Sequence, residues 1–242
     1  LDIRPDVVFT AGDNTNGEGT FEEYITCFDA SWGQFRGMIR PAPGNHDYYT
    51  EKDAASYYQY FGEMAGKIGK GYYSYDVGGW HVVVLNSNCL NIDGCGPSSP
   101  QVQWLRSDLA ASEARCTLAY WHHPRWTSGL AGNSHWLDAF WQALYEYGAE
   151  VVFSGHDHDY ERFAPQDPAG NPDPDGGIRQ FVVGTGGASQ RGFAAPLPNS
   201  EVRNSGEFGV LALTLYPDRY EWQFHPVEPD GFSDSGAGFC HD

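Results

Sequence analysis

The sequence predicts a layered α/β fold. Short apolar segments of strand length alternate along the chain with polar loops and a few helices, which is the pattern of a sheet covered by helices. Four of these segments end in a group of Asp, Asn or His side chains, and ligands gather beyond the carboxyl ends of strands in such folds. With 242 residues, of which 40% are hydrophobic and 15% aromatic, the chain is long enough for one domain with a substantial core.

The predicted elements follow one another at short intervals, without an internal repeat. They are strands over residues 6–11 and 38–42, a hairpin over 72–77 and 80–86, a helix over 100–114, a strand over 117–121, a helix over 135–147, strands over 151–153 and 181–183, and a final hairpin over 210–215 and 220–224.

Local signals support these elements in turn. The first two strands are β-prone runs that stop near Gly12 and Pro43, and the glycine pair 78–79 supplies the turn of the first hairpin. The first helix begins with proline and repeats apolar side chains at helical spacing, and Gly148 closes the second helix. The stretch 164–177 is rich in Pro, Asp and Gly, so we expect a surface loop there, and a Pro-Asp pair turns the final hairpin.

Charge and hydropathy exclude some classes of partner. Asp and Glu number 32 against 14 Lys and Arg, for a net charge of −18, so we expect no general binding to nucleic-acid backbones. The negative charge does not exclude a small anionic substrate, because bound metal ions reverse the local electric field. No apolar run approaches the roughly 20 residues of a membrane span, so we expect no membrane insertion.

The cysteines and the first residue bear on processing. The chain has 5 cysteines, an odd number, so at least one is free or pairs outside the chain. Cys89 and Cys95 bracket a short loop, and both a local disulfide and a set of small buried thiols remain open there. The chain begins at Leu1 without a visible leader. We therefore expect a secreted or periplasmic protein whose leader was removed, or a chain that is incomplete at its start.

The four polar groups at the strand ends carry the candidate chemistry. Carboxylate and amide oxygens and imidazole nitrogens are ligands for divalent metals, and a preceding glycine lets the backbone turn sharply off a strand. His156 and His158 are two residues apart, so an extended segment points them the same way, toward two neighbouring metals. Asp13 has two oxygens and can bridge metals about 3.5–4 Å apart. The groups are Gly12-Asp13-Asn14, Gly44-Asn45-His46-Asp47, His122-His123-Pro124 and Gly155-His156-Asp157-His158.

Each group alone has a structural interpretation. An Asp after a Gly is usually part of a turn, and a single His is more often a hydrogen-bonded structural residue than a ligand. The occurrence of all four groups in this order, each at a predicted strand end, is far more specific than any one of them.

These motifs resemble the calcineurin-like metallophosphoesterase superfamily, and within it the purple acid phosphatase-like branch. The matching motifs are G-D-N-T-N at 12–16, G-N-H-D at 44–47, H-H-P at 122–124 and G-H-D-H-D-Y-E-R at 155–162, and the last of these together with the stretch 32–47 points to the phosphatase branch. The resemblance spans about residues 5–225. It implies a four-layer αββα sandwich with a binuclear metal centre at one sheet edge, in a single domain over 1–242 that includes the hairpin region 208–226.

The resemblance also implies roles for residues. Asp13 would bridge two metal ions, divalent or trivalent (Fe, Zn or Mn), His158 would bind the first, and the second would be held by Asn45, His122 and His156. His46 would be catalytic: it would face the substrate and stabilise the charged transition state or protonate the leaving oxygen. Weaker candidates for substrate contact are His123, His135 and Arg125, and a structural cap is an equal interpretation of His135.

Two departures from the family pattern matter. The position three residues after the bridging Asp carries Tyr in purple enzymes and Asn16 here, so we expect no tyrosinate-to-iron charge transfer. The opening D-x-[GH] motif, whose Asp binds the first metal, is absent from this sequence. We expect it upstream, because the first metal would otherwise have only Asp13 and His158 from this chain.

The resemblance implies a hydrolase that cleaves small phosphate monoesters with a metal-bound hydroxide. Alternatives are a phosphodiesterase or nucleotidase of the same fold, or an inactive remnant with one metal site or none. A carbohydrate- or partner-binding secreted domain is a further alternative, suggested by the aromatic content alone.

Overall fold

A seven-stranded mixed sheet forms the centre of the computed structural model, which describes residues 3–241. The strand order is β3-β4-β5-β6-β8-β7-β9, in which β4, β5, β6 and β8 run parallel. The bounds are β3 Tyr73–Val77, β4 Trp80–Val84, β5 Cys116–Tyr120, β6 Val151–Ser154, β7 Tyr160–Phe163, β8 Arg179–Val183 and β9 Ser200–Asn204. Every residue of β4, β5 and β6 is buried, as expected for parallel strands covered on both faces.

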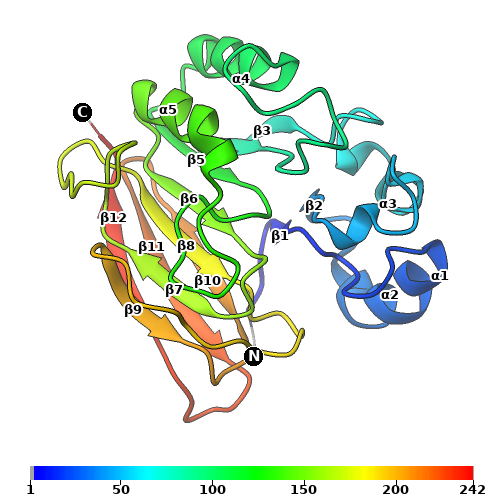
Figure 1. Cartoon of the computed structure of the whole chain (residues 1–242). Coiled ribbons are helices and arrows are strands. Elements are labelled where there is room, and N and C mark those ends of the chain that lie inside the picture. Colours follow the sequence, from blue (N-terminus) through cyan, green and yellow to red (C-terminus); the bar gives the residue numbers. More distant parts are fainter. Residues whose placement is uncertain (1–2, 242) are drawn as a thin grey trace.

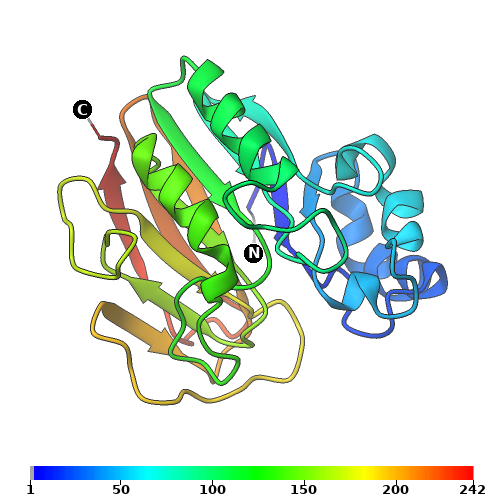
Figure 2. The same ribbon diagram turned by 45° about the horizontal axis from the view of Figure 1, so that its top comes forward.

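Two helices cover one face of this sheet. They are α4, Pro100–Ala111, and α5, Asp138–Glu146, which continues from a 3₁₀ turn over His135–Leu137. The hydroxyl of Ser99 accepts the backbone N–H of Val102 and so caps the start of α4. Figure 2 shows the two helices side by side over the strands, and their apolar side chains form a core with Val83, Ala119 and Val152.

A second sheet covers the other face. It is antiparallel, in the order β10-β11-β12, with bounds Gly209–Leu215, Arg219–Pro226 and Ser235–Phe239. Large aromatic side chains fill the space between the two sheets: Trp80, Tyr120, Phe153, Phe181, Trp222 and Phe224. The hairpin of β10 and β11 therefore shares its core with the central sheet.

The N-terminal part of the chain forms a parallel pair of short strands with its own helices. The strands are β1, Val8–Ala11, and β2, Ile39–Ala42. The helical segments are α1 Phe21–Glu23, a π turn Tyr24–Phe28, α2 Asp29–Ser31, 3₁₀ turns over Trp32–Phe35, His46–Tyr48 and Gly62–Ala65, and α3 Ala55–Phe61. Figure 1 shows α1, α2 and α3 gathered beside β1 and β2, apart from α4 and α5. A cluster of buried tyrosine and phenylalanine side chains holds them there.

The predicted α/β layering is confirmed, as are the predicted strands and the two long helices, with ends that differ by a few residues. Strands β7, β9 and β12 and the helices α1 to α3 were not predicted.

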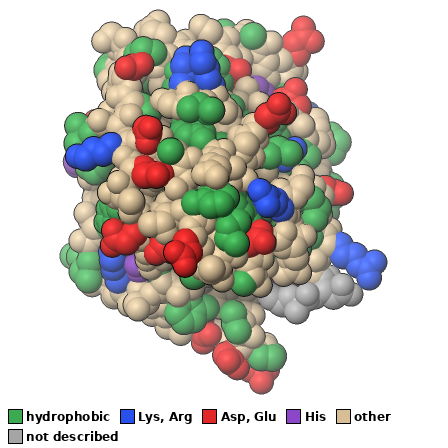
Figure 3. Space-filling model, turned by 90° about the vertical axis from the view of Figure 1, so that its right-hand side faces the viewer, with side chains coloured by type: hydrophobic (Ala, Val, Ile, Leu, Met, Phe, Trp, Pro, Cys, Tyr) green, Lys and Arg blue, Asp and Glu red, His purple; other side chains and the backbone are tan. Residues whose placement is uncertain are grey.

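Cys89 is disulfide-bonded to Cys95 and Cys116 to Cys240, and Cys27 is free and exposed. Among residues 3–241, no helix is long and apolar enough to cross a membrane. On the face seen in Figure 3, acidic and basic side chains are scattered among apolar ones.

Candidate metal centre

Four strand ends bring their polar groups to one place. Asp13 follows β1, Asn45 follows β2, His122 follows β5 and His156 follows β6. The ends are tied by hydrogen bonds: Nδ1 of His122 lies 2.7 Å from the carbonyl oxygen of Ala11, and the N–H of Gly155 donates to the carbonyl of His122 at 3.0 Å. The predicted convergence is thus present, because parallel neighbours end on the same edge of a layered fold.

Three polar side-chain atoms surround one ring nitrogen of His122 at this edge. Nε2 of His122 lies 3.0 Å from Oδ1 of Asn45, 3.2 Å from Oδ2 of Asp13 and 3.1 Å from Nδ1 of His156. The carbonyl of Ala11 only accepts, so Nδ1 of His122 carries a proton and neutral His122 presents a lone pair at Nε2. In this state Nε2 of His122, Oδ1 of Asn45 and Oδ2 of Asp13 face one another with lone pairs, which favours a proton or a metal ion among them.

The titration behaviour of these groups reflects the same crowding. Burial opposes the charged form of His122, but the nearby Asp13 carboxylate outweighs it and raises the pKa of His122. Burial also opposes ionisation of Asp13, and His122 and His46 together still hold the pKa of Asp13 below its ordinary value. Burial and the neighbouring His122 lower the pKa of His156 to about 3, so His156 is neutral and keeps a lone pair for a ligand.

A divalent cation fits this donor set. One carboxylate, one amide oxygen and two imidazoles are the mixed ligands that Zn, Fe and Mn accept. Asp13 and His156 also adopt left-handed backbone conformations, with φ of 50° and 67°, which are uncommon for residues other than glycine. Such strain is concentrated at functional sites, and here it turns two side chains toward His122.

His158 lies two residues beyond His156 and is buried. Its Nδ1 lies 2.7 Å from the carbonyl of Ser189, which leaves Nε2 as the atom with the lone pair. Within the described part of the chain, a group of histidines whose ligand atoms lie within 4.8 Å of one another comprises His122, His123 and His156, and it does not include His158. A second such group, Cys116, Glu150 and Cys240, is no thiolate site because both cysteines are in a disulfide.

His46 stands beside Asp13 and is partly exposed. Its backbone N–H donates to Oδ1 of Asp13 at 2.9 Å, and its Nε2 lies 3.9 Å from Oδ2 of the same carboxylate. Nδ1 of His46 lies 2.6 Å from the carbonyl of Gly17, so this nitrogen carries a proton and the ring is held in one orientation.

The three weaker candidates for substrate contact lie in different environments. The ring of His123 lies 4.4 Å from that of His156, and its Nδ1 is 2.8 Å from Oγ of Ser87. Arg125 is buried, pairs with Asp138 and lies over the ring of Trp126 at 3.8 Å, so its guanidinium is engaged by the scaffold. His135 is exposed at the start of the 3₁₀ turn that leads into α5.

Asp47 is a supporting residue that received no role from the sequence, although it is the last residue of the G-N-H-D motif. Its carboxylate is buried and accepts hydrogen bonds from the N–H of Gly44 at 2.7 Å, from Asn14 at 3.2 Å and from the hydroxyl of Tyr24. These bonds fix the loop that carries Asn45. The Asp at the end of the motif was the available signal, but its partners come from distant segments.

The fold and site together define a class of protein: two packed sheets with a cluster of Asp, Asn and His side chains at one sheet edge. The model of the calcineurin-like phosphoesterase family matches residues 2–160, and the chain belongs to that family.

Curated relatives are similar in sequence to this chain, and a solved structure shares its fold. Purple acid phosphatase 22 of Arabidopsis thaliana is 35% identical over 166 residues, which cover 64% of this chain and 36% of the relative. Purple acid phosphatase 15 of the same plant is 30% identical over 149 residues, or 54% and 27% of the two chains. The purple acid phosphatase PPD1 from yellow lupin (Lupinus luteus) seeds superposes with a TM-score of 0.78 at 19% identity, over 96% of this chain and 46% of the lupin chain, which shows a shared fold. The matched regions thus span 27% and 36% of these two curated relatives.

Proposed function

We propose that this chain is the metal-dependent catalytic part of a phosphate-ester hydrolase that acts on small phosphate monoesters. The observation that carries the proposal is the convergence of Asp13, Asn45 and His156 on Nε2 of His122, all within 3.2 Å. Membership of the calcineurin-like phosphoesterase family and the similarity to purple acid phosphatases support it.

Two sets of side chains would hold two metal ions. Asn45, His122 and His156 would hold one, His158 the other, and Asp13 would contact both. When bound, the ions supply Lewis-acid chemistry: they neutralise phosphoryl charge and acidify water. The metals would be divalent or trivalent ions such as Fe, Zn or Mn.

Side chains of this chain would supply the hydrogen bonds and the proton that the reaction needs. His46 directs Nε2 toward Asp13, and with protons on both ring nitrogens it would donate a hydrogen bond from Nε2 to the phosphoryl group or a proton to the leaving oxygen. The contact between its Nδ1 and the carbonyl of Gly17 keeps the ring from turning away. His123 would lie beside the bound ester, because its ring neighbours that of His156.

Metal analysis together with hydrolysis assays tests the proposal. The purified chain is assayed with p-nitrophenyl phosphate and bis(p-nitrophenyl) phosphate while its metal content is measured. We expect two ions per chain and hydrolysis of the monoester; preference for the diester would favour a phosphodiesterase, and one ion or none without activity would favour a remnant.

Two variants sharpen this test. His156→Ala should abolish metal-dependent hydrolysis and leave the circular dichroism spectrum unchanged. His241→Ala is the matched control, since His241 contacts Gly148 and Glu150 at the opposite end of β6. Full activity and full metal content in His156→Ala would overturn the assignment.

Two further proposals concern the whole chain. The disulfides Cys89–Cys95 and Cys116–Cys240 support maturation in an oxidising compartment, as in a secreted or periplasmic protein. The common core of the central sheet and the β10–β11 hairpin supports a single domain over 1–242.

A further inference from the structure

We propose that Tyr49 is a positioning residue for the metal centre: it fixes the side-chain amide of Asn45 with the oxygen toward the metal, and it braces the ring of His46. The proposal rests on the proposed function. Two contacts of Tyr49 lead to it. Nδ2 of Asn45 donates to the hydroxyl of Tyr49 at 3.0 Å, and the rings of Tyr49 and His46 lie 4.2 Å apart.

The amide of Asn45 needs such a partner because its two ends have the same shape and opposite chemistry. Oδ1 can bind a cation, whereas Nδ2 carries two hydrogens and repels one. With Oδ1 at 3.0 Å from Nε2 of His122, Nδ2 must point away from the cluster, and the hydroxyl of Tyr49 accepts its hydrogen there. A flipped amide would place the NH₂ group among the ligand atoms. By accepting from Nδ2, the hydroxyl of Tyr49 anchors the amide in the orientation that can bind metal.

The second contact limits the motion of His46. Tyr49 directly follows the 3₁₀ turn His46–Tyr48, and its backbone N–H donates to the carbonyl of His46 at 3.2 Å. This turn brings the ring of Tyr49 back against the ring of His46. The carbonyl of Gly17 holds Nδ1 of the same ring at 2.6 Å, so two contacts together determine where Nε2 points.

Burial does not account for the placement of Tyr49. Its side chain is 54% exposed, whereas the preceding Tyr48 is 6% exposed and bonds to Asn86 in the interior. A half-exposed ring adds little to the core, and the side-chain contacts of Tyr49 described above go to two residues of the site. When a residue that holds a metal ligand in place is removed, metal affinity typically falls by roughly 10- to 100-fold.

Three variants separate the two contacts. Tyr49→Phe removes the hydroxyl and keeps the ring, and Tyr49→Leu removes both. Tyr147→Phe is the matched control, because Tyr147 is another exposed tyrosine and lies at the end of α5. Each chain is stripped with a chelator and titrated with Zn²⁺ by calorimetry, and kcat and KM for p-nitrophenyl phosphate are then measured in excess Zn²⁺.

We expect Tyr49→Phe to weaken Zn²⁺ binding by roughly tenfold, without a change in the unfolding midpoint of the metal-free chain. Excess Zn²⁺ should restore its kcat. Tyr49→Leu should keep a low kcat in excess Zn²⁺ with a nearly unchanged KM, because the ring of His46 has lost its support. Tyr147→Phe should match the wild type in every measurement.

Equal Zn²⁺ affinity in Tyr49→Phe and the wild type would overturn the inference, as would an equal loss in Tyr147→Phe. A loss of affinity in Tyr49→Phe that is matched by a fall in metal-free stability would also overturn it, since Tyr49 would then be structural. A wild-type chain that binds Zn²⁺ but hydrolyses no ester would overturn the proposed function instead, and the comparison of affinities would still decide the role of Tyr49.

Discussion

His122 donates a hydrogen bond from Nδ1 to the backbone carbonyl of Ala11 over 2.7 Å, and this contact joins the end of β5 to the end of β1. It also selects the tautomer in which Nε2 of His122 faces the cluster with a lone pair. The lone pairs of His122, Asp13 and Asn45 then face one another, and a bound cation would stabilise this arrangement. The first prediction follows from this.

Metal binding should stabilise the fold. In Zn²⁺ at about 100 times its dissociation constant, the free energy of unfolding should rise by about 2.7 kcal/mol, because the ion binds the folded chain alone. Differential scanning calorimetry with and without a chelator measures the shift. His156→Ala should lose most of it. An unchanged unfolding midpoint of the wild type in Zn²⁺ would contradict the presence of a metal site.

The glycine before Asn45 should be needed for metal binding. A Cβ added at Gly44 would lie 2.1 Å from the backbone nitrogen of Asp13 and 2.2 Å from its Oδ1, so Asp13 must move. We expect Gly44→Ala to weaken Zn²⁺ binding at least about tenfold and to lower stability by about 1–3 kcal/mol. Calorimetric titration and urea unfolding measure both effects. At Gly37, where an added Cβ meets nothing within 4 Å, the same substitution should do neither.

The sequence predicted those parts of the fold and site that depend on apolar strands and their ends. The strand over 151–153 is a continuous apolar run, and the polar residues that follow such runs converge at one edge. Strand β7 was missed because it carries Glu161 and Arg162, and β12 because it is rich in glycine. Helix α3 buries tyrosines, which give little polar contrast to define a helical face, and α1 and α2 are only 3 residues long each.

Contacts between distant segments could not be predicted for a different reason. The pairing of Cys116 with Cys240 joins residues 124 apart, and spacing alone does not determine such a pairing. Tyr49 follows no strand, and a 3₁₀ turn rather than a sheet edge brings it to Asn45. The sequence pattern therefore predicted side chains that converge at one edge, but not Tyr49, which contacts two of them.

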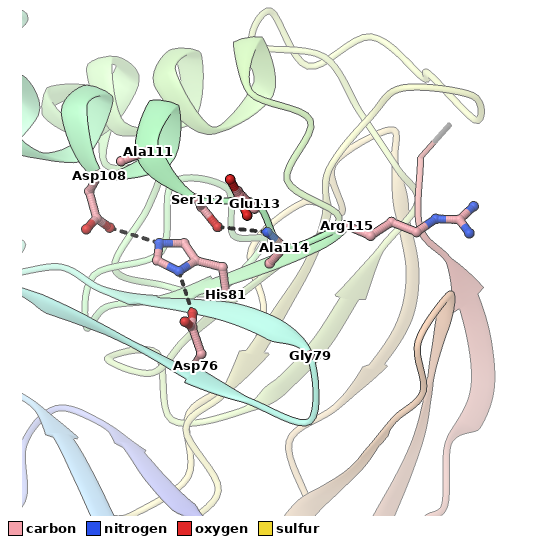
Figure 4. A pocket seen from close by; sticks show the side chains of 9 residues that line it. All are labelled: Asp76, Gly79, His81, Asp108, Ala111, Ser112, Glu113, Ala114 and Arg115. Carbon is pink, nitrogen blue, oxygen red and sulfur yellow. Dashed lines mark hydrogen bonds and ion pairs between the residues drawn. The ribbon is translucent and has the colours of Figure 1, made fainter.

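The stability contributed by His81 should depend on pH. His81 is buried between two carboxylates, with Nδ1 2.9 Å from Asp76 on β3 and Nε2 2.9 Å from Asp108 on α4, at the edge of an open pocket of about 660 Å³ (Figure 4). The hydrogen bond to Asp108 raises the pKa of His81, burial opposes this, and Asp76 adds to the rise. The folded state thus holds the His81 proton more tightly than the unfolded chain does.

This difference in proton affinity determines the direction in which stability changes with pH. The charged contacts of His81 stabilise the fold fully below the unfolded pKa of about 6.5, and this stabilisation is lost as the pH rises through the higher folded pKa. His81→Gln should therefore cost on the order of 1 kcal/mol more at about pH 5.5 than at about pH 8.5. Urea unfolding across this range measures the difference. Asp76→Asn should reproduce part of the effect, and a pH-independent cost of His81→Gln would contradict the prediction.

The two disulfides should differ in what they contribute to stability. The pair Cys116–Cys240 closes a loop of 124 residues and holds the end of the chain after β12 against β5, whereas Cys89–Cys95 spans 6 residues. Loop-closure entropy predicts a loss of about 5 kcal/mol for the double serine variant of the long pair and about 2 kcal/mol for that of the short pair. Urea unfolding without reductant measures both losses. Cys27→Ser is the control, since Cys27 is exposed and free, and it should change stability by less than about 0.5 kcal/mol. If removing the short pair cost as much as removing the long pair, native-state strain or residual structure in the unfolded chain would outweigh loop entropy in this protein.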